Sequence, residues 1–206
     1  EYFENSGYSK FFLVTHHWGA NWNKGFDVYQ KIDNMLSEKY WNEKIEFTYI
    51  GNVPKDFSFK NSDKVEPLSG LELANKIKQS HIYITASINE PSGNHHIEAA
   101  QCSLPIMYIN SGGIPEYCKD FGIMFDLTTL EEKILYALMN YKKYQKNMSN
   151  YPFNASTMSS EYLYEFNNLL NQKTRIVANR DLSMLETNSE LLFKFKRYIK
   201  RIFNIR

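Results

Sequence analysis

Glycine divides this 206-residue chain into two unlike parts. All nine glycines lie at or before Gly122, whereas residues 123–206 contain none and have Pro152 as their only proline. Because glycine permits tight turns and close approaches of the backbone, this distribution predicts a loop-rich first part and a mostly helical second part. We therefore expect a domain over residues 1–150 and a helical segment over residues 151–206.

Within the first part, short β-branched or aromatic runs alternate with helical patterns. Strands are predicted at residues 10–15, 45–50, 64–66, 81–85, 105–109 and 122–125. Helices are predicted at residues 26–40, 71–79, 93–102, from Thr128 or Thr129 to about Met148, and in the second part at 155–171 and 184–205. Ser69 and Glu72 fit a capping box for the second helix. This alternation favours an α/β fold: a Rossmann-like parallel sheet with helices on both faces, followed by C-terminal helices.

Composition and charge exclude several classes of protein. The chain is 43% hydrophobic and 23% charged, as in ordinary globular proteins, and no stretch approaches the roughly 18 apolar residues of a membrane span. Its two cysteines, Cys102 and Cys118, form no CxxC pair, so we expect a reducing, cytoplasmic setting. Residues 191–206 hold six basic and no acidic residues, which leaves 18 basic against 23 acidic residues before them. Residues 1–190 therefore carry a net negative charge, which does not favour binding to nucleic acid.

In parallel α/β sheets, ligands bind beyond the carboxyl ends of the strands. The loops to inspect are therefore residues 16–25, 51–54, 67–70, 87–96 and 110–116. The sharpest of these signals is the segment Glu90-Pro-Ser-Gly-Asn-His-His-Ile-Glu98. With Ser92 as N-cap, the free amides of Gly93, Asn94 and His95 form an anion site, and the two carboxylates reach opposite ends of one ligand. The same residues also fit a well-capped helix with Glu98 in a salt bridge.

The other loops give weaker signals. Lys24 offers a cation to a phosphate, although its position taken alone favours a solvated surface lysine. The pairs His16-His17 and His95-His96 suggest a metal, but adjacent strand residues face opposite ways and no HExxH motif is present, so we expect no metal. Gly112-Gly113 either closes over a ligand or makes a turn with positive φ. Fingerprints of dinucleotide sites, P-loops and nucleophile elbows are absent.

Together these loops resemble the C-terminal, donor-binding domain of retaining glycosyltransferases of the GT-B fold, family four, over roughly residues 10–150. Glu90 to Glu98 matches the family's E-x7-E signature, and Lys24-Gly25 matches its KG element. Tyr49–Asn52 stands where the family has a strand that ends in glycine, here Gly51. The segments PLSGLELANKIKQSHIYITAS and SLPIMYINSGGIPEYC match the stretches before and after the signature.

The resemblance implies a role for each matched residue. Glu90 would bind hydroxyls of the donor sugar and Glu98 the ribose. The diphosphate would lie on Lys24 and the amides of Gly93, Asn94 and His95. The nucleobase would lie against the backbone of Leu68, Ser69 and Gly70, with Leu73 nearby. Gly51 would also contact the donor nucleotide. The family's arginine ahead of the lysine is missing, so Asn21 or a histidine of the first pair is expected to replace it.

The implied function is transfer of a sugar, with retention, from a nucleotide diphosphate-sugar to a glycan or lipid-linked acceptor, without a metal cofactor. Since the chain starts at Glu1 and offers no acceptor domain, we expect it to be a piece of a longer protein. Three alternatives remain: a glycoside hydrolase, a GT-B sugar epimerase and a non-catalytic nucleotide-sugar binding module. The basic, amphipathic stretch 185–206 fits two roles, contact with anionic lipid at the inner face of a membrane or packing on the missing N-terminal domain.

Overall fold

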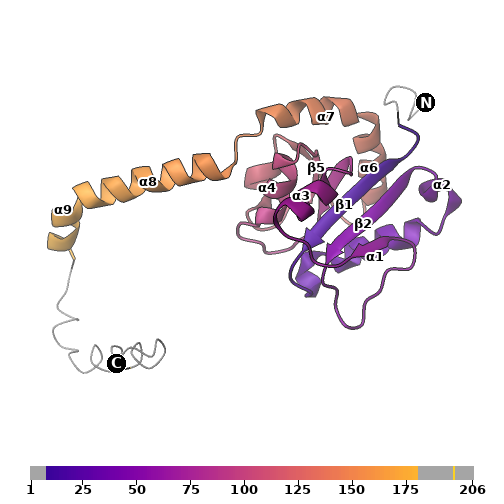
Figure 1. The fold of residues 1–206 in the computed structure, drawn as a ribbon, viewed down its shortest axis with the longest axis horizontal. Coiled ribbons are helices and arrows are strands. Elements are labelled where there is room, and N and C mark those ends of the chain that lie inside the picture. Colours follow the sequence, from indigo (N-terminus) through magenta and orange to yellow (C-terminus); the bar gives the residue numbers. More distant parts are fainter. Residues whose placement is uncertain (1–7, 181–196, 198–206) are drawn as a thin grey trace. The chain divides into compact units, whose positions relative to one another are not determined.

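The computed structural model describes residues 8–180 and Arg197, and its first part is built on a six-stranded sheet (Figure 1). The strands are β1 (Phe11–His17), β2 (Ile45–Gly51), β3 (Asp63–Val65), β4 (Ile82–Thr85), β5 (Ile106–Ile109) and β6 (Gly122–Phe125). The helices are α1 (Phe26–Met35), α2 (Lys39–Asn42), α3 (Gly70–Ile77), α4 (Asn94–Gln101), α5 (Ile114–Cys118), α6 (Leu130–Met139), α7 (Tyr141–Asn147), α8 (Ala155–Asn171) and α9 (Lys173–Ala178). Two 3₁₀ turns, η1 (Trp22–Lys24) and η2 (Met148–Asn150), complete the structure.

All strand pairs are parallel, and the strand order is β3-β2-β1-β4-β5-β6. The order reverses between β1 and β4, which pair through Leu13 with Ile82 and Val14 with Tyr83. In open α/β sheets, a crevice for ligands opens where the strand order reverses, beyond the carboxyl ends of the strands. The topology therefore directs attention to the segments that follow β1 and β4.

Alternate residues of β1, β2, β4 and β5 belong to two separate hydrophobic cores. Leu13 on β1 packs with α1 and α6 side chains such as Tyr29 and Ile134, whereas Val14 packs on the other face with α3 and α5 side chains such as Ile77 and Ile114. Both faces of the sheet are thus covered by helices, because side chains along a strand alternate between its faces. The expected Rossmann-like α/β fold is confirmed.

Several predicted boundaries were wrong. β1 continues to His17, so the two histidines belong to the strand and not to the loop after it. The helix predicted at residues 26–40 ends at Met35 because Glu38 adopts an extended backbone conformation, and a separate short helix, α2, follows. The helix predicted up to Met148 is interrupted at Asn140, whose backbone leaves the helical range between α6 and α7.

Two local predictions were also wrong. Ser69 occupies the N-cap position of α3, but no side-chain hydrogen bond caps this helix, so the capping box with Glu72 is not formed. The loop predicted at residues 110–116 contains the start of α5, with Pro115 in the first turn, where a missing N–H costs no hydrogen bond.

The chain divides between Asn154 and Ala155 into two compact units. The first contains the sheet and its helices, and the second contains α8, which matches its predicted bounds, and α9. The predicted helix at 184–205 and the predicted contact through 185–206 lie outside the described residues, Arg197 excepted. Among the described helices, none is long and apolar enough to cross a membrane.

Candidate functional site

An ion pair marks the carboxyl edge of the sheet where β1 and β4 meet. The Nζ of Lys24, after β1, lies 2.5 Å from an oxygen of Glu90, after β4. Their side chains are only 23% and 19% exposed. The two loops are joined independently by the amide of Ile88, which donates a 2.8 Å hydrogen bond to the carbonyl of Asn23. Residues far apart in sequence are thus fixed as one charged, partly shielded site.

The first turn of α4 faces the same region. Gly93 is the N-cap, with an extended backbone, and no side chain caps the helix. The prediction of Ser92 as N-cap was therefore wrong, and the Ser92 hydroxyl lies instead 3.2 Å from the Tyr117 hydroxyl. Without a capping side chain, the amides at the start of α4 are available to an anion, as are those of any uncapped helix start.

The Gly112-Gly113 turn contacts the backbone of the loop that carries Glu90. The amide of Gly113 donates a 2.8 Å hydrogen bond to the carbonyl of Glu90. Gly112 has φ +58°, and a Cβ at this position would lie 2.2 Å from the same carbonyl oxygen. Gly112 thus fits the interpretation with positive φ, whereas Gly113 has φ −88°, and both glycines lie close to protein backbone.

Glu98, about one turn into α4, is held by a histidine. Its Oε2 lies 2.8 Å from Nε2 of His16, whose Nδ1 lies 3.1 Å from the hydroxyl of Tyr83. The hydrogen bond from His16 is the main reason that the pKa of Glu98 lies below its usual value. The Glu98 side chain remains 52% exposed, whereas the His16 side chain is only 5% exposed. A buried imidazole therefore holds a carboxylate that a ligand can still reach.

Three other histidines, His17, His95 and His96, are buried. His17 Nε2 lies 2.8 Å from the Tyr29 hydroxyl, and His95 Nε2 lies 2.8 Å from the Thr85 hydroxyl. Burial is the largest cause that lowers the pKa of His17, His95 and His96, that of His96 to about 4. His96 has no hydrogen-bond partner for either ring nitrogen.

These contacts bear on two earlier expectations about the histidines. Both ring nitrogens of His16, and Nε2 of His17, are bonded to protein groups, so His16 has no free ring nitrogen to offer a phosphate. Within the described part of the chain, no three His, Cys, Asp or Glu side chains are placed to hold a metal ion. Asn21 stays exposed at the start of η1, where its carbonyl accepts a hydrogen bond from the Lys24 amide.

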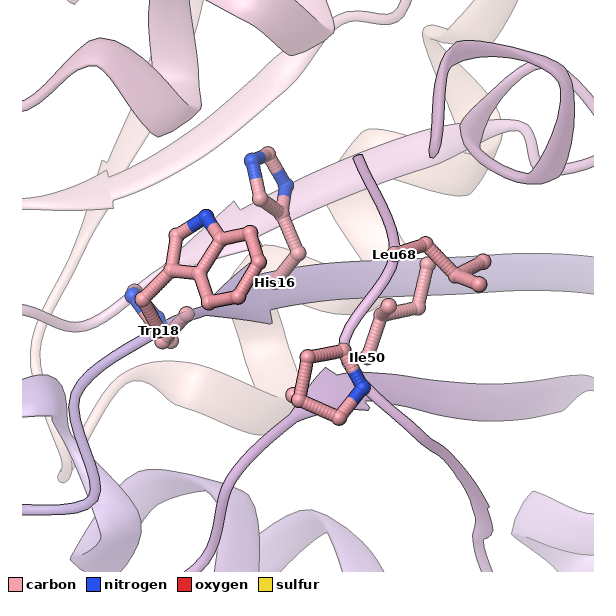
Figure 2. Close-up of a pocket in the computed structure, with 7 residues that line it drawn as sticks. His16, Trp18, Ile50 and Leu68 are labelled. Atoms are coloured by element: carbon pink, nitrogen blue, oxygen red, sulfur yellow. The ribbon is translucent and has the colours of Figure 1, made fainter. Parts of the chain in front are cut away.

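A small pocket adjoins this site at the ends of β1 and β2 (Figure 2). Its lining residues come from these two strands and from the segment before α3: His16, His17, Trp18, Ile50, Gly51, Pro67 and Leu68. The pocket thus brings together Gly51 and Leu68, both predicted to bind the donor nucleotide. Ser69 next to it is exposed, and Leu73 is buried among the core residues under α3.

Sequence reasoning missed two residues here. Trp18 lines the pocket and is 64% exposed, an unusual state for the largest apolar side chain. Tyr83 is fully buried behind His16. The exposed tryptophan beside a predicted binding loop could have been noticed, whereas the role of Tyr83 depends on the pairing of β1 with β4.

The chain matches a family model over most of its first unit. The matching model is that of glycosyl transferases group 1, and it covers residues 24–154. The match begins at Lys24 and ends where the first compact unit ends. It therefore includes Lys24, Glu90 and the whole of α4.

Relatives of known function match a shorter stretch. The phosphatidylinositol N-acetylglucosaminyltransferase GPI3 subunit of Saccharomyces cerevisiae is 31% identical over 104 residues, which cover 46% of this chain and 23% of the relative. A phosphatidylinositol N-acetylglucosaminyltransferase subunit of Homo sapiens is 30% identical over 105 residues, which cover 46% of this chain and 21% of the relative. The chain thus matches less than a quarter of the length of these relatives.

Solved structures of glycosyltransferases share the fold. WaaG, a glycosyltransferase involved in lipopolysaccharide biosynthesis, superposes with a TM-score of 0.57 at 15% identity, over 73% of this chain and 46% of its own. Sucrose-phosphate synthase from Thermosynechococcus elongatus gives a TM-score of 0.58 at 16% identity, over 78% and 46%. These likenesses concern the fold, and the family match concerns the sequence. From that match, which spans well over half of the residues, we conclude that this chain belongs to the glycosyl transferases group 1 family.

Proposed function

We propose that this chain is the donor-binding part of a retaining glycosyltransferase. In this proposal a nucleoside diphosphate-sugar binds at the carboxyl edge of the sheet, and its sugar is transferred to a glycan or lipid-linked acceptor. The observation that carries the proposal is the Lys24–Glu90 pair beside the uncapped start of α4, with Glu98 on the same helix. Retention of configuration rests on the resemblance to family four.

The charge of the leaving group explains why these residues suit the reaction. When the bond between the anomeric carbon and the phosphate breaks, negative charge grows on the departing diphosphate. The ammonium of Lys24 and the amides of Gly93, Asn94 and His95 would stabilise this charge, each such donor contributing roughly 2–4 kcal/mol to lowering the barrier. Because these groups already supply positive charge, we propose a reaction that needs no metal cofactor.

Glu90 and Glu98 would hold the two ends of the donor. Glu90, in front of the helix, would accept hydrogen bonds from hydroxyls of the sugar, and Glu98 from hydroxyls of the ribose. The nucleobase would enter the pocket between Gly51 and Leu68. Asn21, exposed next to Lys24, would make an additional contact with the phosphates.

The acceptor and the cellular setting are proposed from the matched relatives and from the cysteines. The relatives named above are phosphatidylinositol N-acetylglucosaminyltransferase subunits, which favours a lipid-linked acceptor and a multisubunit enzyme. We propose that an N-terminal domain outside this chain binds the acceptor, and that residues 185–206 contact either that domain or a membrane surface. The two free cysteines support a reducing, cytoplasmic location.

Among the alternatives, a glycoside hydrolase is disfavoured by the site itself. Its general acid needs a raised pKa, whereas the hydrogen bond from His16 lowers the pKa of Glu98. Glu90, the other candidate, is paired with Lys24. A GT-B type epimerase or a non-catalytic nucleotide-sugar binding module would use the same donor contacts, so these are separated by experiment.

The test is made in the complete protein that carries this chain. Purified enzyme is assayed for sugar transfer from a panel of nucleoside diphosphate-sugars, with and without a lipid extract as acceptor. We expect transfer only with acceptor, and a loss of at least a hundredfold in Glu90→Ala and Lys24→Ala, as for removal of a group that stabilises the transition state. Unchanged turnover in both variants would contradict the proposal, and isomerised donor without acceptor would identify an epimerase.

A further inference from the structure

A buried tyrosine and histidine lie behind the accessible carboxylate of Glu98. Tyr83, from the middle of β4, is fully buried, and its hydroxyl lies 3.1 Å from Nδ1 of His16. The same hydroxyl accepts a 3.2 Å hydrogen bond from the His16 backbone amide. His16 Nε2 then reaches Oε2 of Glu98 at 2.8 Å, so three side chains from β4, β1 and α4 form a continuous chain.

The donors and acceptors of this chain fit in one direction. A carboxylate can only accept, so Nε2 of His16 carries the proton that bonds to Glu98. In the neutral ring, Nδ1 is then an acceptor, and the Tyr83 hydroxyl lies within reach of both this nitrogen, at 3.1 Å, and the His16 carbonyl, at 3.4 Å, while it accepts from the backbone amide of His16. Glu98 thus selects the tautomer, and Tyr83 fixes the orientation of the ring that holds Glu98.

The arrangement restricts the side chain of Glu98 without covering it. A glutamate on the exposed face of a helix ordinarily moves among many rotamers, and ordering it on binding costs free energy. Here one oxygen is bonded to a ring that is 5% exposed, while the glutamate side chain as a whole stays 52% exposed. The carboxylate is thus held in place for a ligand before the ligand arrives.

We propose that Tyr83 and His16 are positioning residues that preorganise Glu98 to bind the ribose hydroxyls of a nucleoside diphosphate. This proposal rests on the proposed function, since it assigns the ribose to Glu98. The expected ligand is a ribonucleotide and not a deoxyribonucleotide, because a carboxylate that is held in place can accept hydrogen bonds from the two neighbouring hydroxyls of a ribose. Substitution of Tyr83 tests the positioning of Glu98 without removing a contact to the ligand, because a fully buried side chain cannot touch the ligand.

The experiment measures how strongly affinity depends on a ribose hydroxyl. UDP, GDP and ADP are titrated calorimetrically into the full chain, and the tightest binder is compared with its 2′-deoxy counterpart. We expect the wild type to bind the ribonucleotide roughly three- to tenfold more tightly, the range of one hydrogen bond. This ratio should fall close to one in Tyr83→Phe and His16→Ala, and His16→Gln should restore part of it, because its amide can donate to Glu98.

A matched control comes from a second buried tyrosine. The Tyr151 hydroxyl is buried without a hydrogen-bond partner, so Tyr151→Phe removes the same atom without breaking a bond. We expect this variant to keep the wild-type ratio, and urea unfolding shows that each variant is folded. A ratio that stays at the wild-type value in both Tyr83→Phe and His16→Ala would overturn the positioning role. If none of the three diphosphates binds the wild type, it is the proposed function that fails.

Discussion

Lys24 and Glu90 are 66 positions apart in the chain, yet their side chains form an ion pair at 2.5 Å. The pair joins the segment after β1 to the segment before α4 and is partly shielded from water. A diphosphate that binds at this edge of the sheet would compete with Glu90 for the ammonium group. The contact therefore ties the binding of an anion to the position of the loop that carries Glu90.

The first prediction concerns this lysine. Lys24→Gln should weaken binding of a nucleoside diphosphate roughly tenfold or more, because a hydrogen bond to a charged group contributes about 1.5–3 kcal/mol. Binding of the nucleoside without phosphates should not change. Both affinities are measured by calorimetry.

A matched control for this variant is Lys31→Gln. Lys31 also forms an ion pair, at 3.0 Å with Glu131, and is similarly shielded at 30% exposure, but it lies on α1. Its substitution should leave both affinities unchanged. Equal losses in the two variants would mean that the effect of Lys24 is only structural.

The second prediction concerns the turn behind Glu90. Gly112→Ala places a Cβ 2.2 Å from the Glu90 carbonyl oxygen and forces a non-glycine residue to φ +58°. It should lower the free energy of unfolding by more than the roughly 1–2 kcal/mol that the left-handed backbone alone costs. It should also weaken diphosphate binding, because the Glu90 loop must move.

Gly70→Ala separates the two causes. Gly70 has nearly the same φ, +56°, but an added Cβ would meet nothing within 4 Å. This variant should lower the free energy of unfolding by the backbone cost alone. Urea unfolding and calorimetry of both variants decide the matter, and equal destabilisation by the two substitutions would refute the close-contact argument.

The third prediction uses the exposed tryptophan of the pocket. A nucleotide whose base enters the pocket should shield Trp18, and the fraction of tryptophan fluorescence quenched by iodide should fall on binding. Trp18→Phe should abolish that change. Trp22→Phe is the control, since Trp22 is also exposed, at 45%, but packs against Phe26 and Phe57 and does not line the pocket. Protection that persists in Trp18→Phe would exclude this location for the base.

The fourth prediction concerns pH. His96 is fully buried, and burial lowers its pKa from 6.5 to about 4. The unfolded chain therefore binds more protons between these values, so stability should fall as the pH falls from 6.5 towards 4. The loss from this residue is on the order of 3 kcal/mol, at 1.36 kcal/mol for each unit of pKa.

His96→Leu should flatten this dependence, which is measured by urea unfolding at a series of pH values. Some acid sensitivity should remain, because burial also lowers the pKa of His17 and His95. Cys118→Ala is a control at another buried position. Since burial raises the pKa of that thiol to about 12, its loss should shift the curve without changing its slope below pH 7. An unchanged slope in His96→Leu would show that this histidine is not the acid-sensitive group.

Local patterns predicted much of the fold and the approximate place of the site. The β-branched runs and helical periodicities identified all six strands, although the histidines at the end of β1 were assigned to a loop. The E-x7-E spacing predicted that Glu90 precedes a helix and that Glu98 lies on it, as observed. Helix interruptions at Glu38 and Asn140 were missed, because periodicity continues across a short break in the backbone.

The sequence by itself determined which segments are strands and helices, which of their faces are buried, and which loops carry charged residues, since these properties depend on neighbours along the chain. Tertiary structure alone decided the partners: Glu90 for Lys24, Glu98 and Tyr83 for His16, and the Glu90 backbone for Gly112 and Gly113. His16 and Glu98 are 82 positions apart. They meet because the sheet places β4 beside β1, and that order follows from packing of the whole domain and not from any local pattern.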